Sequence, residues 1–291
     1  MSGGTLLLTA CALLAFAGNS LLCRAAIGGG AIDPANFTLI RLVSGAAALF
    51  LLSGARTSKL PRGRASFLTA LPLALYAIAF AFAYVRLPAG TGALILFGAV
   101  QLTMLISAWR GGERPGFAEW FGIALALAGL VWLVAPGVTA PPPGSAVLMA
   151  LAGVAWGVYS LHGRGAANAL AETTANFLRA VPFALLPLIG VWPHAQWTWP
   201  GIGLAIASGA LASGVGYVLW YRALPRLTAT RAAAVQPAVP ALAALGGVLF
   251  LGERLSTRLV FSAALILGGI GLTLVRRRAA RAPDPGPEAT R

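Results

Sequence analysis

Residues 112–129, GERPGFAEWFGIALALAG, return 140 positions later as residues 252–269, GERLSTRLVFSAALILGG. Both stretches begin with Gly-Glu-Arg and then share a Phe, an Ala, two Leu and a Gly in register. Further upstream the match continues at a slightly smaller offset, where Arg41 corresponds to Arg179. The second half of the chain therefore repeats the first.

The duplication divides the chain into four parts. The first repeat covers residues 4–135 and the second covers 145–275. A Pro-rich linker without charge, 136–144, joins them. The last segment, 276–291, is basic, and its prolines and charges predict a disordered cytoplasmic tail that binds anionic lipid headgroups.

The composition is that of an integral membrane protein. Of the 291 residues, 58% are hydrophobic and 10% are charged, whereas soluble domains carry about 25% charged residues. A transmembrane helix needs about 20 mostly apolar residues, and ten stretches of the chain meet this requirement. They lie near residues 4–24, 35–53, 66–85, 88–109, 117–135, 145–164, 174–192, 200–221, 228–250 and 257–275.

Each repeat contains five of these spans, and an odd number of crossings turns the second copy upside down in the membrane. The sequence therefore predicts an all-α integral membrane protein with ten transmembrane helices in two inverted five-helix repeats. Inverted repeats are typical of transporters that work by alternating access, with a central cavity between halves that rock against each other. Because one chain supplies both halves, we expect a monomer.

The distribution of basic residues predicts the orientation. The net charge is +14, and fifteen Lys and Arg residues fall in the loops and tail on the side of both termini, against four on the opposite side. This positive-inside bias predicts that both termini are cytoplasmic, in a multi-pass protein of the cell inner membrane. Because this bias explains the high net charge, we expect no nucleic-acid partner. The expected partners are membrane lipids and a small-molecule substrate.

Three paired motifs carry a resemblance to a known family. The first span of each repeat holds a small-residue or Trp-Gly stretch, AFAGN at 15–19 and AWG at 155–157. The second span of each repeat carries an Arg, in FTLIR at 37–41 and NFLR at 176–179, and a Gly-Glu follows each fourth span. In this set the chain resembles the drug/metabolite transporter superfamily, in its ten-helix form with two EamA domains, over about residues 4–275. Within that superfamily it looks most like the YddG-type branch, and this resemblance implies export of aromatic amino acids.

Aromatic side chains supply the first candidates for substrate binding. Seven of the eight Trp residues lie near span ends, where indoles prefer the headgroup level, and Trp156 alone lies near the middle of a span. Tyr76, Phe80 and Tyr84 form a stripe along one face of the third span. Such residues either line the substrate cavity or pack between helices. The aromatic candidates are Tyr76, Phe80, Tyr84, Phe97, Trp156 and Tyr159.

Three amides are the polar candidates. Gln101 and Gln236 occupy equivalent places in the two repeats, so an inverted two-fold would bring them to opposite walls of one cavity. Gln236 precedes Pro237, and a second proline at position 240 would free the carbonyl of Gln236 to bind a substrate ammonium group. The alternative for the pair is a hydrogen bond between helices. Asn19 in the first span belongs to the same class.

Four charged residues are candidates for gating or structure, together with Pro237 in its broken helix. Arg41 and Arg179 lie about 9 Å inside their spans, close enough for each guanidinium to reach the interface by snorkelling. The alternative is a carboxylate clamp or half of a gate, because Arg binds carboxylates in bidentate fashion. Glu113 and Glu253 follow the fourth and ninth spans, where we expect them to cap or orient the helix junctions, with gating as the alternative.

No carboxylate is expected at the bilayer midplane, since all seven acids map to loops, span ends or the tail. A cation/proton antiporter normally needs such an acid, so the sequence argues against that mechanism. We expect instead an exporter of amino acids, with aromatic or other hydrophobic side chains favoured, or of similar small metabolites. We expect no cofactor, metal site or enzymatic activity. The alternatives are a drug or nucleotide-sugar carrier of the same superfamily, a lipid scramblase, or a non-transporting membrane protein.

Overall fold

The computed structural model describes residues 3–53, 64–112, 116–137, 140–163, 168–191, 195–227 and 235–279. Within these residues every regular element is helical, apart from a single antiparallel bridge between Ile32 and Trp197. Six described helical stretches are long and apolar enough to cross a membrane, and four shorter apolar helices accompany them. The prediction of an all-helical chain built from ten apolar stretches therefore agrees with the structure.

Helices occur in all ten predicted spans. Those of the first half are α1 (Gly3–Gly28), α2 (Pro34–Ser53), α3 (Arg64–Ala83), α4 (Ala89–Arg110) and α5 (Phe117–Val134). The second half contains α6 (Pro143–Gly163), α7 (Ala169–Ala184), α8 (Leu186–Val191), α9 (Trp199–Ile206), η3 (Ala207–Val215), α10 (Gly216–Ala223), η4 (Leu224–Arg226), α12 (Ala238–Leu251) and α13 (Thr257–Ala279). The second half is therefore more interrupted than the first.

The seventh predicted span is broken where a proline removes a backbone donor. α7 ends at Ala184, and α8 begins at Leu186, one residue before Pro187. Pro187 has no N–H to give to the carbonyl four residues earlier, and its ring clashes with that carbonyl. The span therefore continues as a second short helix rather than as one rod.

The ninth predicted span does not provide the free carbonyl expected at Gln236. Pro237 is the N-cap residue of α12, and the Val239 N–H donates to the Gln236 carbonyl at 2.9 Å. Pro240 removes the α-helical bond to this carbonyl, and a tighter turn of the kind common at helix ends replaces it. The first part of the span, 228–234, lies outside the described residues.

The eighth predicted span contains a π-helical segment. α9 continues into η3 and then into α10, and η3 has the sequence ASGALASGV. A π-helix is rare and is often found at functional sites. Its small side chains allow neighbouring helices to come close to it.

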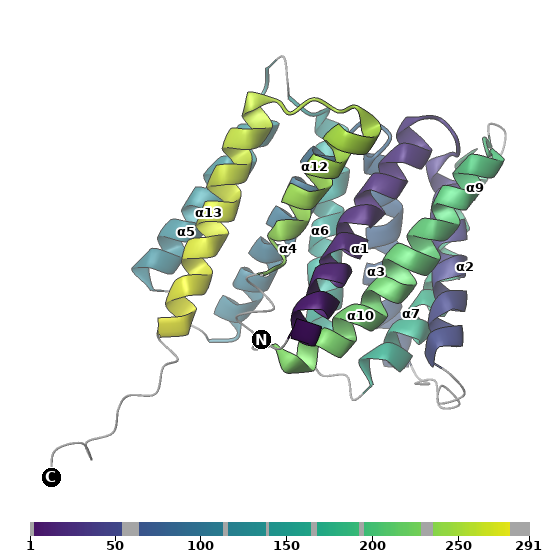
Figure 1. Ribbon diagram of the computed structural model, residues 1–291, viewed down its shortest axis with the longest axis horizontal. Helices are drawn as coiled ribbons and strands as arrows, with labels where there is room; N and C mark the ends of the chain where they lie inside the picture. Colours follow the sequence, from purple (N-terminus) through teal and green to yellow (C-terminus); the bar gives the residue numbers. More distant parts are fainter. Residues whose placement is uncertain are drawn as a thin grey trace, which may run out of the picture.

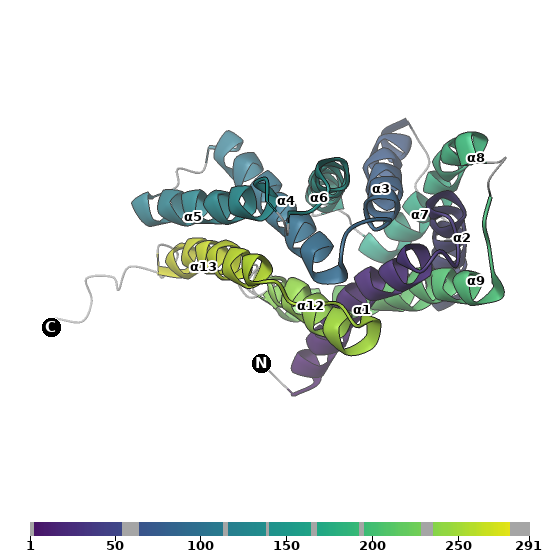
Figure 2. The same ribbon diagram turned by 90° about the horizontal axis from the view of Figure 1, so that it is seen from above.

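α5 and α13 form a pair along one side of the bundle (Figure 2). Gly129 and Gly269 lie in their contact, and a Cβ at Gly269 would overlap the backbone of α5. In the rest of the bundle α1 packs against α12, α10 and η3, and α6 packs against α3 and α4. α2 packs against both α7 and η3, so helices from the two halves are interleaved.

The first residues of α1 and the last residues of α13 lie at the same end of the bundle (Figure 1). At the opposite end the connection after α1 pairs with the connection before α9, where the Asp33 N–H donates to the Gln196 carbonyl at 2.8 Å. The Asp33 carboxylate also accepts from the N–H groups of Ala35 and Asn36 at 3.0 and 2.9 Å, so it caps α2. Two neighbouring connections are thus tied together at this end.

The predicted linker and tail are described only in part. Residues 138–139 and 280–291 lie outside the described residues. α13 runs to Ala279, so the helix continues past the predicted end of the second repeat at 275. Arg is a good helix former, so the sequence of the basic segment is compatible with a helix that extends into it.

Small residues set the distance between α2 and η3. A Cβ at Gly209 of η3 would overlap the Arg41 carbonyl and the Ser44 hydroxyl of α2. A Cβ at Gly45 of α2 would meet the Gly209 carbonyl of η3 at 3.1 Å, as well as the ring of Phe177 on α7. The two helices therefore cross closely at the level of Arg41.

Gly209→Ala is expected to destabilise the protein, because the added methyl group meets the backbone of α2. Overpacking of this kind costs about 1–3 kcal/mol, and thermal unfolding of the purified protein in detergent measures it. Gly203→Ala in the same span is the matched control, since nothing lies within 4 Å of a Cβ at that position. Equal unfolding temperatures for the two variants would contradict the close crossing.

Candidate functional site

A small cavity lies between the two halves of the chain, among α1, α2, α3, α4, α6, η3 and α10. Five residues predicted to bind substrate line it, together with one predicted for gating or structure. They are Asn19, Tyr76, Phe80, Phe97 and Trp156, and Arg41. The structure therefore brings together residues that the sequence places on five different spans.

A hydrogen-bonded network runs along the cavity from η3 to α2. The Ser208 hydroxyl donates to the Asn19 side-chain oxygen at 2.7 Å, and the Asn19 amide donates to the Tyr76 hydroxyl at 3.3 Å. Nη2 of Arg41 donates to the same Tyr76 hydroxyl at 3.1 Å. All four side chains are buried. One polar network thus joins α1, α2, α3 and η3.

Aromatic rings form the apolar side of the cavity. The Trp156 ring centroid lies 4.9 Å from that of Tyr76 and 5.5 Å from those of both Tyr159 and Tyr217. The Tyr76 and Phe80 centroids are 5.3 Å apart. Such separations are typical of favourable aromatic pairs. Trp156 is therefore the centre of a ring cluster that α3, α6 and α10 supply.

Arg41 turns inward, so the snorkelling expectation does not hold for it. The residue is 2% exposed, and its guanidinium carbon lies 5.2 Å from the Tyr76 ring centroid and 5.0 Å from that of Phe80. The faces of these rings attract a cation, which favours the inward direction. Its repeat counterpart, Arg179, is half-buried on α7 and lies outside the cavity lining.

Two of the predicted tyrosines are not part of the cavity lining. The Tyr84 hydroxyl donates to the Ala89 carbonyl at 3.2 Å, across the connection between α3 and α4. The Tyr159 hydroxyl donates to the Thr173 hydroxyl at 3.4 Å, which draws it toward α7. Each hydroxyl thus has a protein partner away from the cavity, although the Tyr159 ring still contacts Trp156.

The two glutamines are also absent from the cavity lining. Gln101 is buried on α4, one helical turn beyond Phe97, which does reach the cavity. Gln236 is half-buried in the turn that precedes α12. The structure therefore does not bring the pair to opposite walls of this cavity, and their role in binding stays a prediction.

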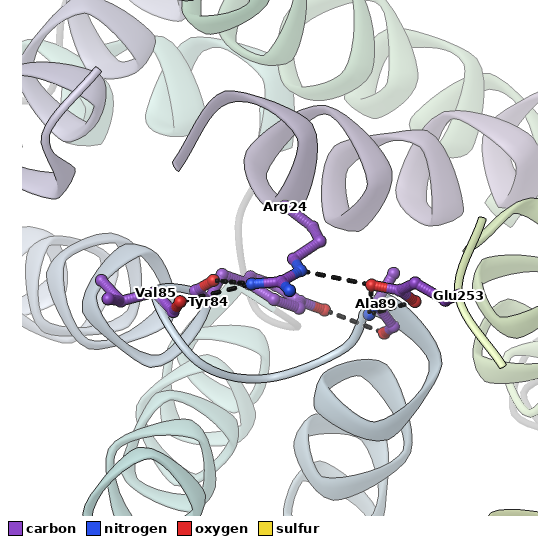
Figure 3. A network of polar contacts seen from close by, with 5 residues as sticks. All are labelled: Arg24, Tyr84, Val85, Ala89 and Glu253. Atoms are coloured by element: carbon purple, nitrogen blue, oxygen red, sulfur yellow. Dashed lines mark hydrogen bonds and ion pairs between the residues drawn. The ribbon is translucent and has the colours of Figure 1, made fainter. Parts of the chain in front are cut away.

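A second polar cluster ties helices together at the end of the bundle opposite the start of α1 (Figures 1 and 3). The Glu253 carboxylate, in the connection after α12, accepts from the Ala89 N–H at 2.8 and 3.0 Å and pairs with Arg24 at 3.2 Å. Arg24 on α1 also donates to the carbonyls of Tyr84 and Val85 at 3.0 and 3.3 Å. We call these five residues the Arg24–Glu253 latch.

The latch gives Glu253 a different role from the one predicted. The sequence assigns it to the junction between α12 and α13, whereas the carboxylate caps the N-terminus of α4 in the other half of the chain. A carboxylate at this place satisfies a helix N–H that has no partner within the helix, and the helix dipole stabilises its charge. Glu113, its repeat counterpart, lies outside the described residues.

Several residues at the cavity are not among the predicted site residues. They are Phe16, Ser20, Leu96, Ala212, Ser213 and Tyr217 in the lining, with Ser208 behind Asn19. The repeat carries a signal for Tyr217, because it follows Tyr76 by 141 positions and both rings contact Trp156. Small residues such as Ser213 carry no comparable signal. Within the described residues no group of three or more His, Cys, Asp or Glu could hold a metal ion.

Glu253→Gln is expected to loosen the latch, because hydrogen bonds to a charged group are worth about 1.5–3 kcal/mol. Cys23, fully buried next to Arg24, reports on this end of the bundle in a Cys11→Ser background. Its reaction with a maleimide should accelerate roughly tenfold, since local opening becomes more frequent.

Glu172→Gln is the matched control for this experiment. Glu172 lies in the first turn of α7, outside the latch, so the same change of acid to amide should leave the Cys23 rate as it is. An unchanged rate in Glu253→Gln as well would mean that the latch does not hold this end closed.

Comparisons with known proteins agree with the membrane architecture. The EamA-like transporter family matches residues 3–135 and again residues 144–275. A solved crystal structure has a TM-score of 0.68 and 24% sequence identity, and the match covers 95% of this chain and 99% of that one. At this identity the likeness concerns the fold alone.

Three relatives match different shares of this chain, and the names of two of them state a function. An uncharacterized protein of Pseudomonas aeruginosa is 53% identical over 95% of this chain and 97% of its own length. A probable terminal-alkyne amino-acid exporter of Streptantibioticus cattleyicolor is 30% identical over 86% of this chain and 88% of its own. The threonine/homoserine exporter RhtA of Escherichia coli is 32% identical over 44% of each chain.

Proposed function

We propose, since this chain belongs to the EamA-like transporter family, that it exports amino acids, with aromatic and other hydrophobic side chains favoured, or similar small metabolites. Transport would proceed by alternating access through the cavity between the two repeats. The observation that carries the proposal is this cavity, in which a hydrogen-bonding network faces a cluster of aromatic rings. Such a lining suits a small substrate with a polar head and an apolar side chain.

Two relatives support the substrate class. One carries the name of a probable exporter of a terminal-alkyne amino acid, a compound with an apolar side chain, and it matches most of this chain. RhtA is named for threonine and homoserine, whose side chains are polar, and it matches less than half of this chain. The longer match therefore favours amino acids with apolar side chains.

The pattern of helix packing supports two halves related by an approximate two-fold. The contact of α3 with α6 has its counterpart in the contact of η3 and α10 with α1, and the contact of α4 with α6 has its counterpart in that of α12 with α1. Three further contacts, of α4 with α12, of α5 with α13 and of α2 with α7, each join a helix of the first repeat to its own counterpart in the second. Inverted repeats that rock about a shared cavity would have such a pattern.

The positive-inside bias supports an orientation with both termini in the cytoplasm, at the inner membrane. In this orientation the Arg24–Glu253 latch lies on the outer side, and the conformation would be closed to the outside. A single chain contains both repeats, so the transporter would work as a monomer surrounded by lipid.

Other carriers fit the cavity less well. A nucleotide sugar has two or more negative charges, whereas Arg41 is the one cation among the described residues that line the cavity. A carrier of cationic drugs that exchanges them for protons would need an acid, and none of the described lining residues is acidic. A lipid scramblase would differ in showing no saturable, substrate-dependent flux.

Trp156→Ala is expected to lower phenylalanine counterflow by about tenfold or more, because aromatic contacts of about 0.5–1.5 kcal/mol each are lost around the site. The assay uses proteoliposomes loaded with unlabelled amino acids and follows the entry of labelled phenylalanine. Membrane insertion of the variant should be normal.

Trp132→Ala controls for the loss of an indole. Trp132 is 52% exposed on α5, where it contacts Phe261. Its replacement by Ala should leave phenylalanine counterflow unchanged. Competition by tryptophan and methionine, but not by cationic dyes, would support an amino-acid carrier. Flux of dyes or sugars with none for any amino acid would overturn the substrate class, and wild-type flux in Trp156→Ala would remove Trp156 from the site.

A further inference from the structure

The guanidinium of Arg41 has donors that the protein does not use. The residue is 2% exposed and lines the cavity, yet Nε and Nη1 have no hydrogen-bond partner. The hydrogen bond from Nη2 to the Tyr76 hydroxyl is the one that the structure gives to this side chain. Two of three nitrogens on a buried cation are therefore available to a bound molecule.

The charge of Arg41 is likewise uncompensated. A guanidinium stays protonated in proteins, and within the described residues no carboxylate pairs with it. Glu253 is engaged by Arg24, and Asp33 caps α2. The rings of Tyr76 and Phe80 offset part of the loss of water but carry no counter-charge. A buried cation of this kind in a membrane protein points to an anionic ligand.

Tyr76 adds a third donor beside the two free nitrogens. A phenolic oxygen accepts through two lone pairs, and here both are used, by the amide of Asn19 and by Nη2 of Arg41. The O–H of Tyr76 itself has no acceptor among the described residues, and Tyr76 lines the cavity. Asn19 is in turn fixed by Ser208. The network thus orients one cation and one hydroxyl toward the same space.

We propose that Arg41 binds the carboxylate of the transported substrate through Nε and Nη1, with the Tyr76 hydroxyl as a further donor. This inference rests on the proposed function and specifies its substrate class, which is a monocarboxylate with an apolar or aromatic side chain. The side chain lies against Trp156 and Tyr217, and an ammonium group, where present, interacts with the ring faces. Amines that lack a carboxylate are not substrates.

The first test uses the wild-type protein and varies the ligand. Phenylalanine, phenylalaninamide, phenethylamine and 3-phenylpropionate compete with labelled phenylalanine in counterflow, and each is also added to purified protein in a thermal-shift assay. Losing a hydrogen-bonded charge weakens binding by roughly 10- to 100-fold. We expect that loss for phenylalaninamide and phenethylamine, whereas 3-phenylpropionate keeps its competition. Equal competition by phenylalanine and phenylalaninamide would overturn the inference.

The second test varies Arg41. Arg41→Gln should raise the KM for phenylalanine by roughly 10- to 100-fold and remove the preference for phenylalanine over phenylalaninamide. A purely structural role would lower the amount of folded protein without removing that preference. Arg41→Lys keeps the charge but not the planar, forked geometry of the guanidinium. Its KM for phenylalanine should therefore lie between those of the wild type and of Arg41→Gln. Arg110→Gln, at an exposed position at the end of α4, controls for the loss of one positive charge.

The outcomes separate this inference from the proposed function. If no amino acid is transported but 3-phenylpropionate raises the unfolding temperature of wild type and not of Arg41→Gln, the carboxylate site stands and amino-acid export fails. If phenylalanine is transported with the same KM in Arg41→Gln, export stands and the carboxylate site fails. Stabilisation by phosphate esters and not by carboxylates would assign the cavity to another anion and overturn the inference.

Discussion

A guanidinium enclosed in an apolar helix bundle needs hydrogen-bond partners, because a buried charge without them is strongly unfavourable. Arg41 meets this need only in part, through the Tyr76 hydroxyl and the ring faces beside it. Other groups around the cavity hold the Arg41 side chain in place. Asn19 and Ser208 fix the hydroxyl, and the missing side chain of Gly209 lets η3 pack on the backbone of Arg41 itself.

Arg24 and Arg41, both in the first half of the chain, illustrate two different ways in which the bundle accommodates a cation. Arg24 is paired with Glu253 and with backbone carbonyls, so its donors join α1 to two connections at one end of the bundle. Arg41 lies deeper and keeps two donors unused. A paired, partly exposed charge serves well as a structural tie that opens and closes, whereas an unpaired buried charge is suited to a ligand that brings its own counter-charge.

Much of the fold was predictable because apolar length and the repeat are strong signals. The ten spans agree with helices, and the depth of Trp156 and the spacing of Tyr76 and Phe80 led to residues of one cavity. The break in the seventh span was not predicted, although Pro187 explains it. The π-helix of η3 has no comparable signal, since its small residues are equally typical of ordinary close packing.

The direction in which a side chain or carbonyl points was harder to predict from the sequence than the helix on which it lies. Snorkelling of Arg41 depends on rotamer and neighbours, and the aromatic faces that turn it inward come from α3, which the sequence of α2 does not reveal. The free carbonyl of Gln236 failed because removing one hydrogen bond at a helix start allows a tighter turn to form another. The prediction that Gln101 and Gln236 lie on opposite walls of one cavity rested on the symmetry of the repeat alone. Gln101 lies one helical turn beyond Phe97 on α4, and Phe97 lines the cavity whereas Gln101 does not.

The most direct test of this account is a structure of the protein determined with phenylalanine bound, in a lipid nanodisc. We expect density for the ligand between Arg41 and Trp156, with its carboxylate within hydrogen-bond distance of the two free guanidinium nitrogens. Phenylalanine bound elsewhere, with Arg41 still unpaired or paired to a protein carboxylate, would contradict it.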